Sequence, residues 1–193
     1  MQMRKSRAMI LPALAMAVAT VFFAPGAMAS ESTAPAPHAA ASSPIPSSSS
    51  ATVNLRPTGT ASNAVDPECK LFFMNQQGKP GGLAHISSFL FHHHDIRAVK
   101  INAKVECRRV VMNLFMQVTL WKTGLIVPHK VAGPNPPATA AKGNQLKDQN
   151  IWKECKNRTS TTYYGTSYAS VWFQGVQYTG SLQSGNATLD CGT

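Results

Sequence analysis

The segment from Val99 to Cys107 alternates strictly between apolar and polar side chains, and this pattern limits the folds open to the chain. Its apolar residues are Val99, Ile101, Ala103, Val105 and Cys107, and its polar residues are Lys100, Asn102, Lys104 and Glu106. Successive side chains of a strand point to opposite faces of its sheet. The segment is therefore predicted to be a half-buried strand of an antiparallel sheet.

Other segments show the same period of two. Met112 to Leu120 alternates after Arg108-Arg109, and Leu125 to Val127 is predicted to return beside it as a hairpin. Further strands are predicted over residues 70–74, 84–91, 163–173 and 187–191, and the proline-containing stretch 133–149 is predicted to be a loop. Six to eight short strands indicate an all-β, antiparallel β-sandwich, with a small barrel as the alternative fold.

Residues 1–29 have the order of a cleavable signal peptide. Three basic residues, Arg4, Lys5 and Arg7, precede an apolar run over residues 9–23, and small residues follow it. The run is shorter than the roughly 20 apolar residues of a membrane-spanning helix. We therefore expect cleavage after this segment, a secreted extracellular protein, and no transmembrane anchor in the mature chain.

Cleavage would change the charge and leave a low-complexity leader. The chain has 18 basic and 8 acidic residues and a net charge of +10; without the three bases of the signal, 15 basic residues and a charge of +7 remain. These bases are scattered, so specific nucleic-acid binding is not expected. Residues 30–65 are rich in Ala, Pro, Ser and Thr and are expected to be a disordered linker, which leaves residues 66–193 as one domain.

The chain has an even set of cysteines: Cys69, Cys107, Cys155 and Cys191. In an exported protein such a set is expected to form two disulfides. Spacing alone permits three pairings. Because Cys107 and Cys191 each end a strand on its apolar face, we expect these two to pair, and Cys69 to pair with Cys155. A zinc site is the alternative, but no two cysteines have the short spacing typical of one.

Three segments resemble small exported proteins of high-GC Gram-positive bacteria. They are Ala103 to Cys107, Tyr164 to Phe173 and Thr188 to Cys191. The resemblance implies an immunoglobulin-like or related β-sandwich and an extracellular location, without an activity. Trp121 follows Cys107 by 14 residues, which is similar to the core Cys and Trp of immunoglobulin domains. The chain departs from that pattern because no Tyr-x-Cys follows.

Two clusters are candidate binding sites. Alternation places Tyr164, Tyr168 and Trp172 on one face of the predicted Tyr-rich strand, where such rings suit stacking on sugars or simply cover a sheet. The other cluster is the run His92, His93, His94 and Asp95, a weak candidate for zinc or copper. Consecutive side chains seldom converge on one ion, so a polar loop is the preferred interpretation.

The sequence contains no recognised catalytic motif. Gly-x-Ser-x-Gly, His-Glu-x-x-His and a phosphate-binding Gly-rich loop are all absent from it, and its acids show no pairing typical of glycosidases. We therefore expect a secreted, non-enzymatic binding protein without a cofactor, whose partner is a cell-envelope glycan or protein. The alternatives are a secreted antibacterial or toxin-like effector and an extracellular hydrolase.

Overall fold

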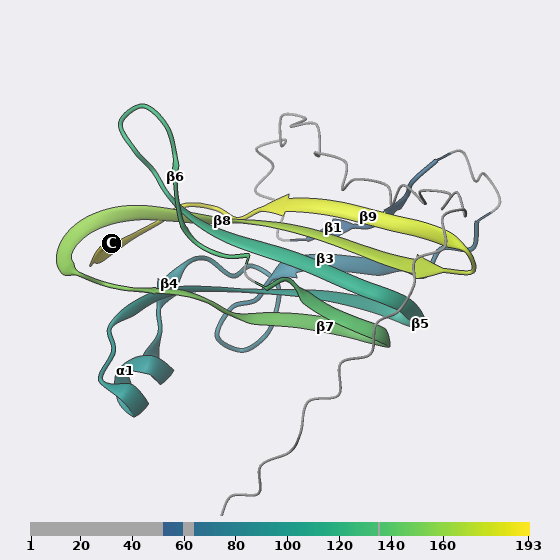
Figure 1. The fold of residues 1–193 in the computed structure, drawn as a ribbon, viewed down its shortest axis with the longest axis horizontal. Coiled ribbons are helices and arrows are strands. Elements are labelled where there is room, and N and C mark those ends of the chain that lie inside the picture. Colours follow the sequence, from purple (N-terminus) through teal and green to yellow (C-terminus); the bar gives the residue numbers. More distant parts are fainter. Residues whose placement is uncertain (1–51, 60–63, 135) are drawn as a thin grey trace, which may run out of the picture. The chain divides into compact units, whose positions relative to one another are not determined.

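The computed structural model describes residues 52–59, 64–134 and 136–193, which all belong to one compact unit. The predicted signal peptide and most of the predicted linker lie outside them. Within these residues the structure has ten strands and one short helix (Figure 1). They are β1 (Val53–Asn54), β2 (Arg56–Pro57), β3 (Cys69–Phe73), β4 (His85–Ile86), α1 (Ser88–His94), β5 (Ala98–Lys122), β6 (His129–Ala132), β7 (Ala138–Glu154), β8 (Asn157–Phe173), β9 (Val176–Gln183) and β10 (Ala187–Gly192). The strand pairs are antiparallel, which confirms the all-β prediction.

Strand β5 is the centre of the sheet. It runs for 25 residues through Arg108-Arg109, where the sequence suggested a break between two strands. Asn113 has a left-handed φ of 47°, and the register of β5 with β8 shifts across it, between Met112 and Phe115. This bulge changes the parity of the buried positions, from odd numbers up to Val111 to even numbers from Leu114 onward. Met112, which simple alternation placed inward, is consequently exposed.

The sheet is nearly closed on itself. Its strand order is β1-β3-β5-β8-β9-β2, and only Leu55 separates β1 from β2 in the chain. One short segment therefore pairs with both ends of the sheet, β3 on one side and β9 on the other. This curled sheet has the closure expected of the barrel alternative. Residues 53–57, assigned to the linker from their composition, belong to the domain because Leu55 is buried in its core.

Strand β7 replaces most of the predicted loop over residues 133–149. Of that stretch only residues 133–137, which include three prolines, precede β7, and the strand then pairs with β5 from Met116 to Ala98. Its half-buried residues include only small or isolated apolar side chains, such as Ala140 and Leu146. Such a strand is held mainly by backbone hydrogen bonds to β5 and has few apolar side chains. Its composition therefore does not predict a strand.

The hairpin after β5 is longer than predicted. The returning strand is β6, in which His129 pairs with Lys122, and Leu125 to Val127 lie in the connecting loop instead of in a strand. Those three apolar residues are strongly exposed. Their β-branched and aliphatic composition resembles a strand, but the loop has no neighbouring strand to pair with at that point.

Two disulfides form, but the predicted pairing was wrong. Cys69 pairs with Cys107, with 3.9 Å between their Cα atoms, and Cys155 pairs with Cys191, at 5.0 Å. Cys69 and Cys107 are direct cross-strand neighbours of β3 and β5, and this register decides the pairing. Both bonds support an oxidising environment for the folded protein. Within the described residues no helix is long and apolar enough to span a membrane.

Candidate functional site: an aromatic face of the sheet

The outer face of β8 carries the three aromatic residues that alternation singled out. Tyr163, Gly165, Ser167, Ala169 and Val171 are buried on the inner face, so Tyr164, Tyr168 and Trp172 all lie on the outer one. Tyr168 is 37% exposed and Trp172 is 40% exposed. The prediction of a shared face is therefore confirmed for these three residues.

Two aromatic residues of β5 extend this row. Trp121 is the cross-strand partner of Tyr164 and stacks on it, with 6.4 Å between ring centroids and 11° between planes. Phe115 meets Tyr168 edge to face at 6.3 Å. We call Phe115, Trp121, Tyr164, Tyr168 and Trp172 the aromatic face. Offset stacking and edge contacts of this kind hold rings in fixed orientations, so the face is organised before any ligand arrives.

Hydrogen-bonding side chains surround these rings. Trp121 donates from Nε1 to the Thr166 hydroxyl at 2.9 Å. Gln117 and Ser181 flank Tyr168 on the neighbouring strands, and Gln177 lies beside Trp172. Burial raises the pKa of Tyr164, so its hydroxyl stays neutral at physiological pH. Flat rings bordered by neutral hydroxyls and amides suit an uncharged, hydroxyl-rich ligand.

Sequence alternation identified the β8 half of this face, and it also placed Phe115 and Trp121 on the face opposite Leu114 and Leu120. It did not join these two residues to the β8 row. They share a face with the even-numbered positions of the first half of β5 because the bulge at Asn113 changes the parity of the strand. The parity change from Cys107 to Leu114 is visible in the sequence and is the signal that locates them. The register that brings β5 beside β8 is a long-range contact without a sequence signal.

The other tyrosines of the Tyr-rich region are core residues. Tyr163 is fully buried and donates its hydroxyl to the Cys191 carbonyl oxygen. Tyr178 is also buried, and its hydroxyl donates to the Val65 carbonyl oxygen at 2.9 Å. Burial raises the pKa of Tyr178. Both satisfy a buried hydroxyl with a backbone acceptor, and neither is available to a ligand.

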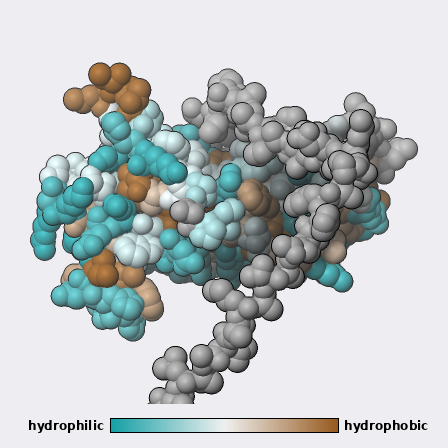
Figure 2. Space-filling view, in the orientation of Figure 1, coloured by the Kyte–Doolittle hydropathy of each residue, from teal (hydrophilic) through white to brown (hydrophobic). Residues whose placement is uncertain are grey.

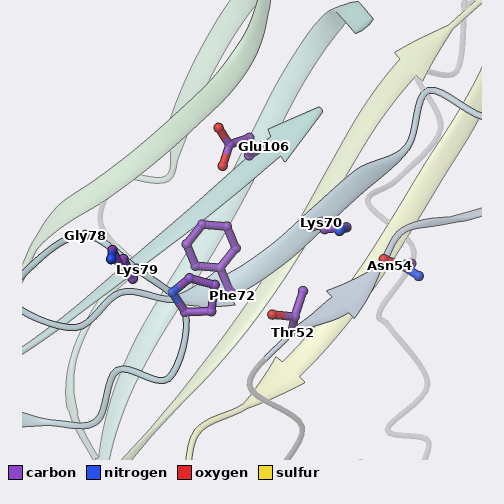
Figure 3. Close-up of a pocket in the computed structure, with 8 residues that line it drawn as sticks. Thr52, Asn54, Lys70, Phe72, Gly78, Lys79 and Glu106 are labelled. Atoms are coloured by element: carbon purple, nitrogen blue, oxygen red, sulfur yellow. The ribbon is translucent and has the colours of Figure 1, made fainter. Parts of the chain in front are cut away.

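A shallow hollow lies on another part of the sheet, over β3 (Figure 3). It is lined by Thr52, Asn54, Lys70, Phe72, Gly78, Lys79, Pro80 and Glu106. Phe72 is almost fully buried, and the Lys104 ammonium lies 5.9 Å from its ring centroid while pairing with Glu106 at 3.1 Å. The lining contains a single carboxylate, so it lacks the pair of carboxylates that most glycoside hydrolases use.

The histidine run forms part of a helix, which corrects the predicted strand over residues 84–91 and the predicted loop after it. Helix α1 begins after Ser87, whose hydroxyl accepts from the Leu90 amide at 3.3 Å, and ends at Asp95 with a left-handed φ of 53°. These two caps outweigh the β-like composition of the segment. His92, His93 and His94 are exposed. Among the described residues, no three His, Cys, Asp or Glu side chains are placed so that they could hold one metal ion.

Asp148 of β7 is a buried carboxylate outside these sites. Its Oδ1 accepts from the Asn150 amide at 3.3 Å, and its Oδ2 has no partner among the described residues. Burial raises the pKa of Asp148, and the Asn150 amide and Lys100 oppose this shift. Burial likewise lowers the pKa of Lys100, against the attraction of Asp148. Keeping the Asp148 carboxylate ionised therefore lowers the free energy of unfolding.

Asp148→Asn is expected to stabilise the protein at pH 7 by about 1 kcal/mol. The pKa of Asp148 is higher in the folded than in the unfolded chain, so its contribution favours folding at low pH and is lost as pH rises through the folded-state value. The difference between variant and wild type should vanish below about pH 3, where the carboxyl is protonated in both states. Urea unfolding at pH 7 and pH 3 measures it, and an equal difference at both values contradicts the assignment.

Comparison of the chain with protein-family models, curated proteins and solved structures finds no match.

Proposed function

We propose that the protein is exported and binds an extended glycan of the cell envelope on its aromatic face, without catalysing a reaction. The supporting observation is the outward row of Tyr164, Tyr168 and Trp172, joined across the sheet to Trp121 and Phe115. Amphipathic rings with polar edges are suited to sugars, whose rings have apolar faces and hydroxyl rims.

The dimensions of the row favour a chain ligand over a single sugar. Residues four apart on a strand are separated by about 13 Å, so the row from Tyr164 to Trp172 extends over roughly 26 Å. The rings lie on the outer face of a sheet instead of in a cleft. A ligand lying along β8 would contact several rings at once and remain open to solvent on its other side, as expected for binding without turnover.

Export to an oxidising compartment is consistent with this proposal. The two disulfides support such a compartment, and the signal peptide predicted over residues 1–29 would deliver the chain there. An immunoglobulin-like relationship, and kinship with small exported proteins of Gram-positive bacteria, stay predictions. Either relationship would favour a role in recognition at the cell surface.

The combined variant Tyr168→Ala and Trp172→Ala is expected to weaken glycan binding roughly tenfold or more, because each removes an aromatic anchor. Pull-down with insoluble peptidoglycan and with purified wall polysaccharide, followed by a binding isotherm, measures the loss. Both side chains are more than one-third exposed, so the variant should keep the melting temperature of the wild type to within a few degrees.

Trp152→Ala is the matched control. Trp152 is an exposed tryptophan of β7, at 39% exposure, and pairs with Lys100 near the opposite end of β5. Its loss should leave the isotherm unchanged. Equal weakening of glycan binding in Trp152→Ala and in the double variant would indicate nonspecific adsorption. Failure of the wild type to bind wall glycan would contradict the proposal.

A further inference from the structure

The loop between β5 and β6 has an exposed aliphatic tip. Leu125 is fully exposed at 107%, Ile126 is 94% exposed and Val127 is 56% exposed. Figure 1 shows this loop standing clear of the sheet, and Figure 2 shows hydrophobic atoms gathered at its outer end. Three consecutive large aliphatic side chains in water oppose solubility, and such a run marks a contact surface.

The base of the loop is fixed, so the tip is held away from the sheet. Thr123 donates to the Thr162 carbonyl oxygen from both its amide, at 2.9 Å, and its hydroxyl. A Cβ atom on Gly124 would lie 2.3 Å from the Val127 carbonyl oxygen and 2.9 Å from the His129 ring. The backbone is thus tightly turned at Gly124, and the aliphatic side chains have no surface of their own domain to cover.

Two lysines stand at the foot of the tip. Lys130 is exposed on β6, and Lys122 ends β5, where its ammonium donates to the Thr193 carbonyl oxygen. The loop between them contains no acid: residues 123–128 are Thr-Gly-Leu-Ile-Val-Pro. An aliphatic end with cations at its base matches the boundary of an anionic bilayer, where acyl chains lie beneath negative head groups. Lysines close to such a surface are attracted to its negative head groups.

We propose that Leu125, Ile126 and Val127 insert into the surface of a bilayer that contains anionic lipid. The composition of the tip favours lipid over a protein partner. The loop protrudes from the sheet (Figure 1), and residues 123–128 contain none of the Trp, Tyr and Arg anchors that dominate the binding energy of protein interfaces. Leu and Val are under-represented among such hot spots. A bilayer needs no complementary shape and accepts aliphatic side chains favourably.

Insertion would be shallow. Loop backbone in the hydrocarbon interior would leave its amides and carbonyls without partners, so the tip should reach only the boundary between head groups and acyl chains, about 5 to 10 Å deep. This surface shares no residue with the aromatic face. Lipid binding and glycan binding can therefore succeed or fail separately.

Sedimentation with lipid vesicles tests the proposal. Wild-type protein with both disulfides formed is expected to bind vesicles of mixed phosphatidylglycerol and phosphatidylcholine, and to bind pure phosphatidylcholine vesicles more weakly. Leu125→Ser with Ile126→Ser should reduce the partition coefficient roughly tenfold or more, since both aliphatic side chains lose their transfer into lipid. Lys130→Glu should remove most of the preference for the anionic vesicles.

The control is Phe89→Ser with Phe91→Ser on α1, which removes two other exposed apolar side chains, 58% and 48% exposed. It should leave vesicle binding and the melting temperature unchanged. The proposal is overturned if wild type ignores the anionic vesicles, or if the tip variant binds them as tightly as wild type does. It is also overturned if the tip variant instead turns an oligomer into a monomer on gel filtration, because the tip would then be a protein contact.

Discussion

Replacing Cys69 and Cys107 together by alanine is expected to lower the free energy of unfolding by about 3 to 4 kcal/mol. The bond closes a loop with a sequence separation of 38 residues, and a cross-link over that distance removes unfolded-chain entropy of this size. It also joins β3 to the centre of β5, where both sulfur atoms are buried in the core. Urea unfolding measures the loss, with m fitted separately for each protein because removing a cross-link expands the unfolded chain.

We compare this loss with the losses measured for the wild type in reducing buffer and for the variant Cys155→Ala with Cys191→Ala. The second bond spans a similar separation of 36 residues, so chain entropy predicts a similar loss for it. A decrease below about 1 kcal/mol for the first pair would mean that the unfolded chain is already constrained there.

The pairing itself is checked by non-reducing tryptic mapping. Trypsin cleaves after Lys70, Lys104, Arg108, Lys153 and Lys156, which separates the four cysteines into different peptides. The peptide containing Cys69 should be linked to the one containing Cys107. A link between Cys107 and Cys191 would restore the pairing inferred from strand ends and contradict the fold.

The alternation of apolar and polar residues was sufficient to predict side-chain orientation where one face of a strand is buried. Alternation from Val99 to Cys107 predicted the inner positions of the first half of β5, and the same logic placed Tyr168 and Trp172 outside. An even number of cysteines predicted two bonds. These features follow from neighbours within one strand, or from composition, and need no knowledge of which strands pair.

Long-range pairing decided the features that sequence could not predict. Cys69 and Cys107 meet because β3 and β5 share a register, and Trp121 reaches Tyr164 for the same kind of reason. Strand β7 can be polar because its backbone pairs with β5 along most of its length. Residues 53–57 join the sheet because β3 and β9, the strands with which they pair, lie close to each other. In each case the cause is a partner distant in the chain, which leaves no mark on local composition.

Closure of the sheet makes the inner side of β8 crowded, and Gly165→Ala is expected to cost about 2 to 3 kcal/mol of stability. A Cβ atom at this position would lie 2.2 Å from Ile101 Cδ1 and 3.0 Å from Phe73 Cε1. Ile101 belongs to the first half of β5 and Phe73 to β3, so the glycine allows opposite walls of the curled sheet to pack together. Both neighbours are buried, so they can move away from the new methyl group only by displacing other core side chains.

Two variants separate this crowding from a general effect of alanine in a strand. Gly143→Ala on β7 places its Cβ no closer than 3.7 Å to the Gln145 carbonyl oxygen, so it should be neutral or stabilise by up to about 1 kcal/mol. Ile101→Val removes the Cδ1 atom that the new methyl group meets. Combined with Gly165→Ala, it should therefore destabilise by less than the sum of the two single changes, and a double-mutant cycle from urea unfolding measures the coupling. Strict additivity would show that Ile101 does not press on β8 at Gly165, and hence that the two walls are further apart than the closed sheet requires.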